Sequence, residues 1–175
     1  MSARASWTAA VLLGVLAGLG ALALVSVGAS DHHPDQGRLR PAATPARSEV
    51  LDVLHDWDRT RARAWASGDP AALRRLYVAG SSAGRADERL LRRYVARGLV
   101  VRRMAMQVLA VRVLASDASR IRVLVTDRLA GGVAVSHGHE VRLPGDTALT
   151  RTLLLRRLDG QWRMVAVRPA GPNGS

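Results

Sequence analysis

Residues 8–29 form an uninterrupted apolar stretch, TAAVLLGVLAGLGALALVSVGA, and no charged side chain lies between Arg4 and Asp31. An α-helix rises about 1.5 Å per residue, so about 22 residues reach roughly 33 Å, which is enough to cross the hydrocarbon layer of a bilayer. Helices in the core of a soluble domain rarely run this long without a polar face. We therefore expect residues 8–30 to form a transmembrane helix behind a short tail at residues 1–7.

A cleaved secretory signal is an alternative interpretation of the same segment. Val27-Gly28-Ala29 resembles the small-x-small pattern before a cleavage site, although the apolar run exceeds the roughly 7–15 residues of a usual signal-peptide core. A very short tail before a long downstream region is typical of a signal anchor. We therefore expect a single-pass cell-membrane protein whose C-terminal domain lies outside the cytoplasm. The flanking arginines do not favour this orientation, because Arg38 and Arg40 follow the span and only Arg4 precedes it.

The next segment indicates a tether. Residues 31–47, DHHPDQGRLRPAATPAR, contain three prolines and no periodic apolar pattern, which is typical of a semi-extended linker. His32 and His33 lie between two aspartates, but no further ligands follow at a fixed spacing, so we interpret them as solvated rather than metal-binding. A folded domain is then expected over residues 48–169, with a disordered tail at residues 170–175.

Arginine dominates the charge of the chain. The 26 basic side chains, all of them arginine, outnumber 14 acidic ones, and the formal net charge is +12. Because there is no cysteine, disulfides, zinc–thiolate sites and cysteine nucleophiles are excluded. The arginine pairs are spread over the chain rather than clustered with stacking aromatic residues, so we expect no nucleic-acid partner. A surface that faces anionic lipid or acidic proteins fits better than a nucleic-acid site, and solvated surface charge is the default interpretation. The pairs are Arg74-Arg75, Arg92-Arg93, Arg102-Arg103 and Arg156-Arg157.

Apolar residues at helical spacing predict a long helix over residues 48–66, with Ser48 as its N-cap. Arg61 falls on the apolar stripe of this helix, whereas Asp58 falls elsewhere on its surface. The sequence SGDP then predicts a stop and a restart, because Gly68 suits a left-handed helix end and the following Asp-Pro suits a new N-terminus. A short helix is expected over residues 70–77.

A loop, VAGSSAGRA, is expected next, and it leads to a third helix over residues 87–97 that ends at a glycine. Beyond it the apolar period changes from helical to extended. The first strand should carry a bulge or strong curvature at Arg102-Arg103, where the alternation slips, and Gly131-Gly132 should separate two later strands. Asp159-Gly160 predicts a final two-residue hairpin turn. The expected strands cover residues 100–115, 120–129, 133–143, 149–158 and 161–168.

Helices first and an antiparallel meander afterwards predict an α+β fold with the helices on one face of the sheet. The order of elements, the corner WASGDPAALRRLY and the terminal LRRLDGQWRMVAV together resemble the nuclear transport factor 2-like superfamily, over about residues 48–168. The resemblance implies a cone of three helices packed on a curved antiparallel sheet. That group includes ketosteroid isomerases, polyketide cyclases and many non-enzymatic members. With an N-terminal span added, the chain looks like small membrane-anchored accessory proteins of actinobacterial envelopes.

The resemblance also directs attention to catalytic positions. Catalytic relatives often place an acid just after the second helix, but here residues 77–82 read YVAGSS and contain no acid or histidine. On the strand side, Asp127 shares a face with apolar residues, where burial would raise the pKa of a carboxyl and suit it to acid or base work. The alternative, which we favour, is a strand-end aspartate paired with Arg128 or another arginine. The catalytic assignment is therefore none, with Asp127 as the one candidate.

Candidates for a ligand pocket or a metal site are few. An apolar pocket in the cone would be lined by bulky residues, although the same aromatic residues would also serve as core filling. His137 and His139, two apart, would share one side of a regular strand and so could bind a metal, but Gly138 favours a loop or irregular strand and an exposed polar edge. We expect no metal and no cofactor. The pocket candidates are Trp57, Tyr77, Tyr94, Asp127 and Trp162.

These patterns favour a membrane-anchored, non-catalytic domain that associates with an envelope protein or with itself through its sheet face. Two alternatives stay open: a small enzyme or apolar-ligand binder that uses the cone, and an electrostatic binder of anionic envelope polymers or lipids. Gly14 and Gly18 form a GxxxG pair that would let two spans approach closely as a homodimer, although glycines are common in apolar spans.

Overall fold

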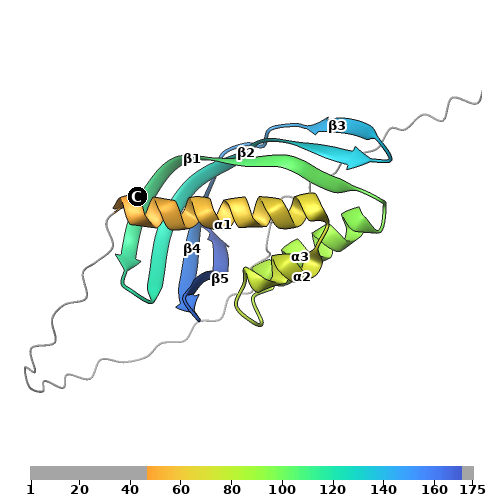
Figure 1. Ribbon diagram of the computed structural model, residues 1–175. Coiled ribbons are helices and arrows are strands. Elements are labelled where there is room, and N and C mark those ends of the chain that lie inside the picture. The colour runs from red at the N-terminus through yellow and green to blue at the C-terminus, as the bar shows by residue number, and fades with distance from the viewer. Residues whose placement is uncertain (1–46, 171–175) are drawn as a thin grey trace, which may run out of the picture.

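A computed structural model describes residues 47–170, which form an α+β domain of three helices followed by five antiparallel strands (Figure 1). The predicted fold class and the predicted order of elements are confirmed. The helices are α1 (Arg47–Ser67), α2 (Pro70–Arg75) and α3 (Ser82–Val95). The strands are β1 (Val100–Ser116), β2 (Arg120–Ser136), β3 (His139–Leu143), β4 (Leu149–Leu158) and β5 (Gln161–Pro169).

The corner between α1 and α2 has the predicted geometry. Gly68 adopts the left-handed conformation, with φ of +64°, and ends α1. Asp69 is the N-cap of α2, and its Oδ1 accepts hydrogen bonds from the backbone N–H groups of Ala71 and Ala72 at 2.9 and 3.0 Å. Pro70 occupies the first helical position, where its missing N–H costs nothing. Ser48 lies inside α1, so the prediction that it is the N-cap is wrong by at least one residue.

Helix α3 begins five residues earlier than the sequence predicted. The Ser81 hydroxyl caps it by accepting a hydrogen bond from the N–H of Gly84 at 3.2 Å. Gly84 lies so close to the ring of Tyr77 that a Cβ at this position would be 2.7 Å from Tyr77 Cγ. Glycine and serine made this stretch resemble a loop, yet the close approach of α3 to the chain after α2 is what requires the glycine.

The sheet is built around β2. Strand β1 pairs with β2 along nearly its whole length, and the opposite edge of β2 is shared by β4 over its first half and β3 over its second half. The expected interruption at Gly131-Gly132 is wrong, because β2 continues through both glycines to Ser136. The chain reverses at His137-Gly138 instead, where φ values of +45° and +83° make a tight turn. Asp159-Gly160, with φ of +51° and +76°, makes the predicted β4–β5 turn.

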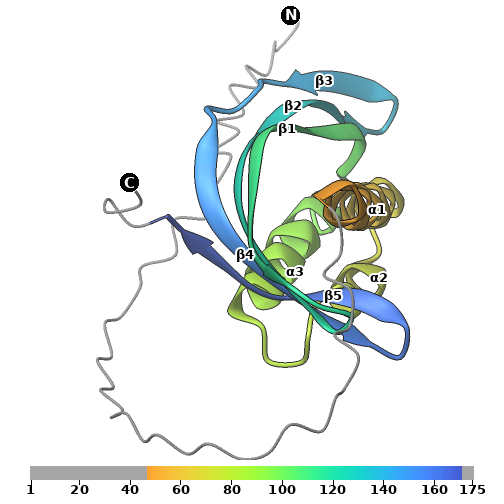
Figure 2. The same cartoon turned by 90° about the vertical axis from the view of Figure 1, so that its left-hand side faces the viewer.

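Bulges bend the sheet around the helices. The register of β1 against β2 shifts at several points, the first of them around Arg103, whose φ of +53° is left-handed. This confirms the irregularity predicted at Arg102-Arg103. Because each bulge increases local twist and bending, the long strands curve over α1 and α3 (Figure 2). We call the sheet face that carries Ile121, Val123 and Val125 the inner face and the opposite one the outer face.

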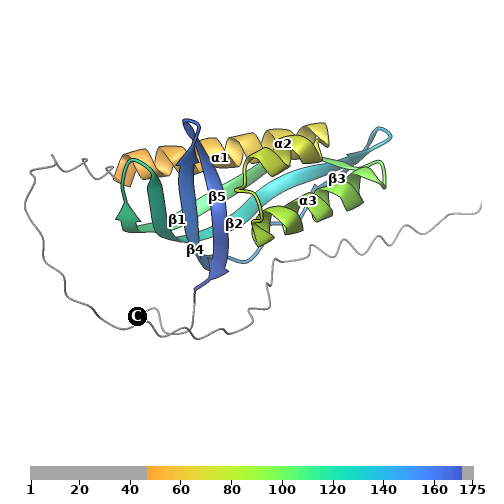
Figure 3. The ribbon, with the colours of Figure 1, turned by 90° about the horizontal axis from the view of Figure 1, so that it is seen from below.

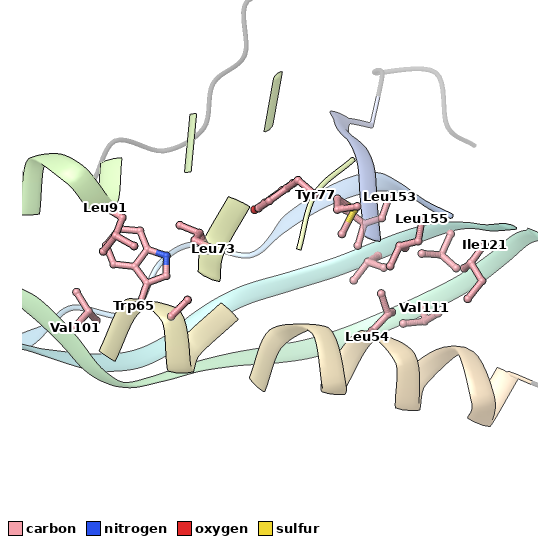
Figure 4. Packing of buried hydrophobic residues seen from close by; sticks show 14 of the residues in the cluster. Leu54, Trp65, Leu73, Tyr77, Leu91, Val101, Val111, Ile121, Leu153 and Leu155 are labelled. Atoms are coloured by element: carbon pink, nitrogen blue, oxygen red, sulfur yellow. The ribbon is translucent and has the colours of Figure 1, made fainter. Parts of the chain in front are cut away.

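All three helices lie against the inner face. Figure 3 shows α2 and α3 beside β5, and the chain between them forms a short parallel bridge from Tyr77 to Met164. The buried side chains come from both layers and fill the space between them (Figure 4). Fully buried members include Leu73 and Leu91 from the helices and Ile121, Val123, Leu155 and Met164 from the sheet.

The predicted span at residues 8–30, most of the linker and the end of the tail lie outside the described residues. Within residues 47–170, no helix has both the length and the apolar character needed to cross a bilayer.

Candidate functional site

The interior of the domain holds one fully buried carboxylate, Asp87 of α3, which is 1% exposed. Arg61 of α1 binds it with two hydrogen bonds, from Nε to Oδ2 at 2.6 Å and from Nη2 to Oδ1 at 2.7 Å. The hydroxyl of Tyr77 donates a third hydrogen bond to Oδ2 at 2.8 Å. The carboxylate is therefore saturated by a bidentate guanidinium and a phenol, which is the geometry that makes burial of a charge tolerable.

The surroundings shift the pKa values of Tyr77 and Arg61 in this network. Burial and the neighbouring Asp87 carboxylate raise the pKa of Tyr77 above its usual range, so the phenol remains a donor. Burial acts against the charged form of Arg61, but Asp87 outweighs it and raises the pKa of the guanidinium. The guanidinium carbon also lies 5.8 Å from the ring centre of Trp65. Through these hydrogen bonds the network joins α1, α3 and the intervening chain.

Asp127 lies on the inner face of β2 and is 7% exposed. Its Oδ1 accepts a hydrogen bond from Nη2 of Arg151 on β4 at 2.5 Å. The two residues share the inner face because Asp127 pairs with Leu149 and Val125 pairs with Arg151 in the β2–β4 register. The partner is thus an arginine two strand positions away, not the adjacent Arg128. Asp127 is also within the strand rather than at its end, because β2 extends to Ser136.

Asp58 of α1 is the second carboxyl in this region. It is half-buried, and the structure gives it no hydrogen bond or salt bridge to another described residue. Burial raises the pKa of Asp58 to about 6, and the negative charge of Asp127 adds to this effect. The positive charges of Arg61 and Arg151 act in the opposite direction but do not cancel the rise. Two neighbouring carboxyls with different pKa values can act as an acid and a base, so Asp58 and Asp127 are a candidate acid–base pair.

Neither of two shallow, partly open hollows on the domain reaches this acidic pair. One, of about 400 Å³, lies between Arg103, Arg142 and the backbone of Gly131 and Gly145. The other, of about 310 Å³, is bordered by Trp162, Ile121, Val53 and Asp117 among others. A catalytic pair needs space for a substrate within hydrogen-bonding distance, and these two hollows do not provide it at Asp58 and Asp127.

The predicted pocket residues are not gathered around one cavity. Trp57 and Tyr77 form an edge-to-face pair with ring centres 5.5 Å apart, and the Nε1–H of Trp57 donates to the carbonyl oxygen of Leu76 at 3.1 Å. Tyr94 packs edge-to-face on Trp65 at 5.4 Å. Trp162 alone borders a hollow, the one of about 310 Å³. Trp57, Tyr77 and Tyr94 therefore pack between the helices, and Asp127 is bound by Arg151 of the sheet.

The histidine pair is separated by the hairpin turn. His137 lies in the turn itself, where its Nδ1 is 2.9 Å from the hydroxyl of Ser136, and His139 opens β3. Gly138 between them has a left-handed φ, so the two side chains do not alternate as on a regular strand. Residues 47–170 contain no group of three or more histidine, aspartate and glutamate side chains arranged to hold a metal ion.

The outer face of the sheet has a different chemistry. Residues directly opposite one another on neighbouring strands point to the same side, so the registers define rows across the sheet. One row runs Arg112, Leu124, Thr152 and Arg168 from β1 to β5. A neighbouring row runs Ala115, Arg122, Leu154 and Ala166.

The arginines of the outer face are exposed and largely unpaired. Arg112, Arg122, Arg156 and Arg168 are all exposed, and none forms a salt bridge or side-chain hydrogen bond with another described residue. The leucine and threonine side chains between them, such as Leu124 and Thr152, are half-buried. No described helix covers this face (Figure 2).

Strand β1 adds exposed apolar side chains beside the outer face. Leu109 and Leu114 are 49% and 40% exposed, and each is the extra residue at a register shift against β2. The strand is an edge of the sheet, in the order β1-β2-β4-β5. Exposed leucines at an uncovered edge are available for contact with a second surface.

Sequence analysis missed two of the residues that define the interior. Asp58 was assigned to the exposed surface of the first helix, and Asp87 was taken as the beginning of the third helix. One signal was available: Arg61 falls on the apolar stripe of the first helix, and a buried arginine requires an acidic partner. That argument predicts that a partner exists, but it does not identify Asp87 among the 14 acidic residues.

No protein-family model matches the sequence, and no curated protein matches it. Among solved structures, the chain is similar to the intermembrane space region of the chloroplast protein ARC6, with 14% identity, a TM-score of 0.51, and coverage of 73% of this chain and 99% of that one. It is also similar to Aln2 from a Streptomyces species, at 14% identity, a TM-score of 0.48, and coverage of 73% and 94%. A third is an NTF-2 like protein of unknown function from Shewanella oneidensis, at 12% identity, a TM-score of 0.43, and coverage of 67% and 96%.

At these identities the likeness shows the fold alone. Together with the observed layers, it shows an α+β fold of three helices packed on a five-stranded antiparallel sheet, which is the arrangement that the resemblance to the nuclear transport factor 2-like superfamily implies. The predicted relation to membrane-anchored envelope proteins stays a prediction.

Proposed function

We propose that this chain is a non-catalytic association domain, held at the cell membrane by residues 8–30, that binds an envelope protein through the outer face of its sheet. The observation that carries the proposal is the contrast between the two faces. The inner face is occupied by the domain's own helices, whereas the outer face is uncovered and bears exposed arginines, with the exposed Leu109 and Leu114 on the edge strand beside it.

The filled interior argues against a ligand-binding cone. Val50, Leu73, Leu91 and Val123 are completely buried between the two layers. The interior charges are largely bound to one another, with Asp87 held by Arg61 and Asp127 held by Arg151. A site that binds a small molecule is usually a largely preformed apolar cavity with a few polar groups that are free to contact the ligand.

The exposed leucines favour a protein partner. Leu109 and Leu114 lie on the edge strand, and the exposed part of each residue would become buried on contact with a second surface. Burying a large apolar side chain contributes on the order of 1–2 kcal/mol when the surrounding contact excludes water. A few such residues at the centre of an interface carry most of its free energy.

One observation favours the enzyme alternative, namely the raised pKa of Asp58 beside Asp127. An acid–base reaction at this pair would require the helix layer to separate from β2 and β4 enough to admit a substrate. Replacement of Asp58 by asparagine distinguishes the two functions: it would abolish proton transfer at this pair and leave association through the outer face unchanged.

Site-specific photo-crosslinking in cells that produce the full chain tests the proposal. A photoreactive amino acid is placed at Thr152 on the outer face or at Leu109 or Leu114 on the exposed edge strand, and at Asp52 or Ser82 on the exposed helix surface as controls. We expect discrete protein adducts from the three sheet positions and none from the two helix positions. Equal adduct yields at all five positions, or no adduct at any sheet position, would overturn the proposal.

A further inference from the structure

We infer that the partner presents an acidic protein surface to the outer face, and that it is not a second copy of this chain. The inference rests on the proposed function, because it concerns the partner of the same face. It is carried by the distribution of carboxylates over the sheet. Among β1, β2, β4 and β5, Asp127 is the one acidic residue, and it points to the inner face.

Over β1, β2, β4 and β5, the outer face therefore contains several arginines and no strand carboxylate to offset them, and the one acidic residue of β3, Glu140, is already bound to Arg103. Arg112 and Arg168 lie at the two ends of one four-strand row, and Arg122 lies in the next row. Arg120 and Arg156 are directly opposite each other on β2 and β4. Elsewhere in the domain, exposed arginines such as Arg59, Arg92 and Arg103 form salt bridges with carboxylates of the chain itself.

Unpaired arginines in this arrangement select for carboxylates. A guanidinium presents a rigid fork of N–H donors that matches a carboxylate, and opposite charges on two surfaces raise the association rate and fix their register. The half-buried Leu124 and Leu154 lie between the arginines in the same rows, so a complementary surface would combine acidic and apolar residues. The Thr126 and Thr150 hydroxyls, 2.9 Å apart, add polar groups at the next row.

A second copy is a poor occupant of this face. A two-fold symmetric contact would place the same face on both sides, so that Arg112, Arg122 and Arg168 of one copy would oppose arginines of the other. Juxtaposed like charges at an interface disfavour such a contact strongly. Over β1, β2, β4 and β5 the outer face has no strand carboxylate that would relieve this repulsion, and Glu140 of β3 is bound to Arg103 of its own chain.

An anionic bilayer is also a poorer fit than a protein. The outer face is the convex side of a strongly bent sheet (Figure 2). A flat surface would touch only the crest of this curve and would leave the two ends of the long strands β1 and β2 out of contact. A protein surface that follows the bend of the strands can contact more of the face than a flat bilayer does.

The test compares two sets of four substitutions in the full chain with the crosslinker at Thr152. The outer set replaces Arg112, Arg122, Arg156 and Arg168 by glutamine. The control set replaces four exposed helix-side arginines that form no salt bridge with a described residue, by glutamine as well. Both sets remove the same charge, and circular dichroism verifies that each variant keeps its fold. The control arginines are Arg75, Arg89, Arg93 and Arg97.

We expect the outer set to lower the adduct yield about tenfold or more, since each lost ion pair weakens binding by a factor of a few, and the control set to leave it unchanged. The crosslinked partner peptide should be rich in aspartate and glutamate. Changing Arg112 and Arg168 to glutamate should abolish the adduct, and exchanging the partner's crosslinked carboxylates for arginine should restore it.

The other outcomes overturn the inference in distinguishable ways. If the adducts persist with the outer set, the association function is retained and the acidic partner is refuted. The same conclusion follows if the control set lowers the adduct yield as much as the outer set does. Adducts between two copies of this chain would show self-association. If no protein adduct forms at any position and the full chain binds phosphatidylglycerol vesicles through the outer set, the face binds lipid and the proposed function fails as well.

Discussion

Most charged side chains on the inner side of the sheet are paired, whereas several arginines on its outer side have no partner in the described part of the chain. On the inner side, Arg61 and Asp87 are joined by two short hydrogen bonds, and Arg151 holds Asp127. On the outer side, Arg112 and its neighbours extend into solvent without a partner among the described residues. The difference indicates that the interior charges stabilise this fold, whereas the outer arginines are available for something outside it.

Asp58 is the exception on the inner side, because it is half-buried without a partner among the described residues. If the comparison is correct, substitutions on the inner side should change stability and those on the outer side should not. Four predictions examine this, each read from urea unfolding of the full chain followed by tryptophan fluorescence.

The largest effect is expected for Asp87→Ala. This change leaves the buried guanidinium of Arg61 and the hydroxyl of Tyr77 without their acceptor, so the free energy of unfolding should fall by about 3–5 kcal/mol. Glu140→Ala is the control, because Glu140 pairs with Arg103 at a position where both side chains are more than half exposed. Its removal should cost less than about 1 kcal/mol. Similar losses from the two substitutions would show that the interior pair is not what holds α1 to α3.

The next effect concerns the close packing of α3. A Cβ at Gly84 would be 2.7 Å from the Cβ and Cγ of Tyr77, so Gly84→Ala should destabilise the domain by about 1–3 kcal/mol through overpacking. Gly131→Ala is the matched control, because nothing lies within 4 Å of a Cβ built at Gly131. If Gly84→Ala proves neutral, the contact between α3 and Tyr77 is looser than described.

A smaller and pH-dependent effect is expected for Asp58→Asn. The folded-state pKa of Asp58 is raised from 3.8 to about 6, so the folded chain keeps a proton that the unfolded chain releases between these values. The stability contributed by this group is present below pH 3.8 and is lost as the pH rises through about 6. Wild type should therefore lose about 1–2 kcal/mol relative to Asp58→Asn between pH 4 and 7, after allowance for partial exposure. A stability difference that does not change with pH would mean that Asp58 has an ordinary pKa.

The smallest effect is expected on the outer face. Replacing Arg112, Arg122, Arg156 and Arg168 by glutamine removes no described salt bridge, so each change should alter the free energy of unfolding by about 0.5 kcal/mol or less. The measurement also serves as the folding control for the crosslinking experiment. A large loss of unfolding free energy would contradict the comparison, because it would show that the outer arginines stabilise the fold.

Local signals in the sequence predicted most of the elements. Gly68, Asp69 and Pro70 fix the helix corner by their own backbone preferences, and Asp159-Gly160 fixes the last turn. The merged strand at Gly131-Gly132 was not predictable in this way. Glycine is compatible with both a break and a strand. This segment is a strand because it pairs with β1 on one side and with β3 on the other.

The candidate sites were less accessible from the sequence. The spacing of Ile121, Val123, Val125 and Asp127 correctly placed the aspartate on the apolar face, but the choice of Arg151 among many arginines depended on the β2–β4 register. The rows of the outer face depend on the same registers. A shift of one residue would turn every side chain of a strand to the opposite face.

The sequence by itself determined the order of helices and strands, most of the elements, and the apolar side of strands such as β2 from Ile121 to Asp127, because these follow from short-range backbone preferences and from periodicity. Only the tertiary structure decided which charges meet and which are left exposed. Arg61 and Asp87 are 26 positions apart, and Arg112 and Arg168 belong to opposite edges of the sheet. Their partners, or the lack of them among the described residues, depend on helix packing and strand register, which no local pattern specifies.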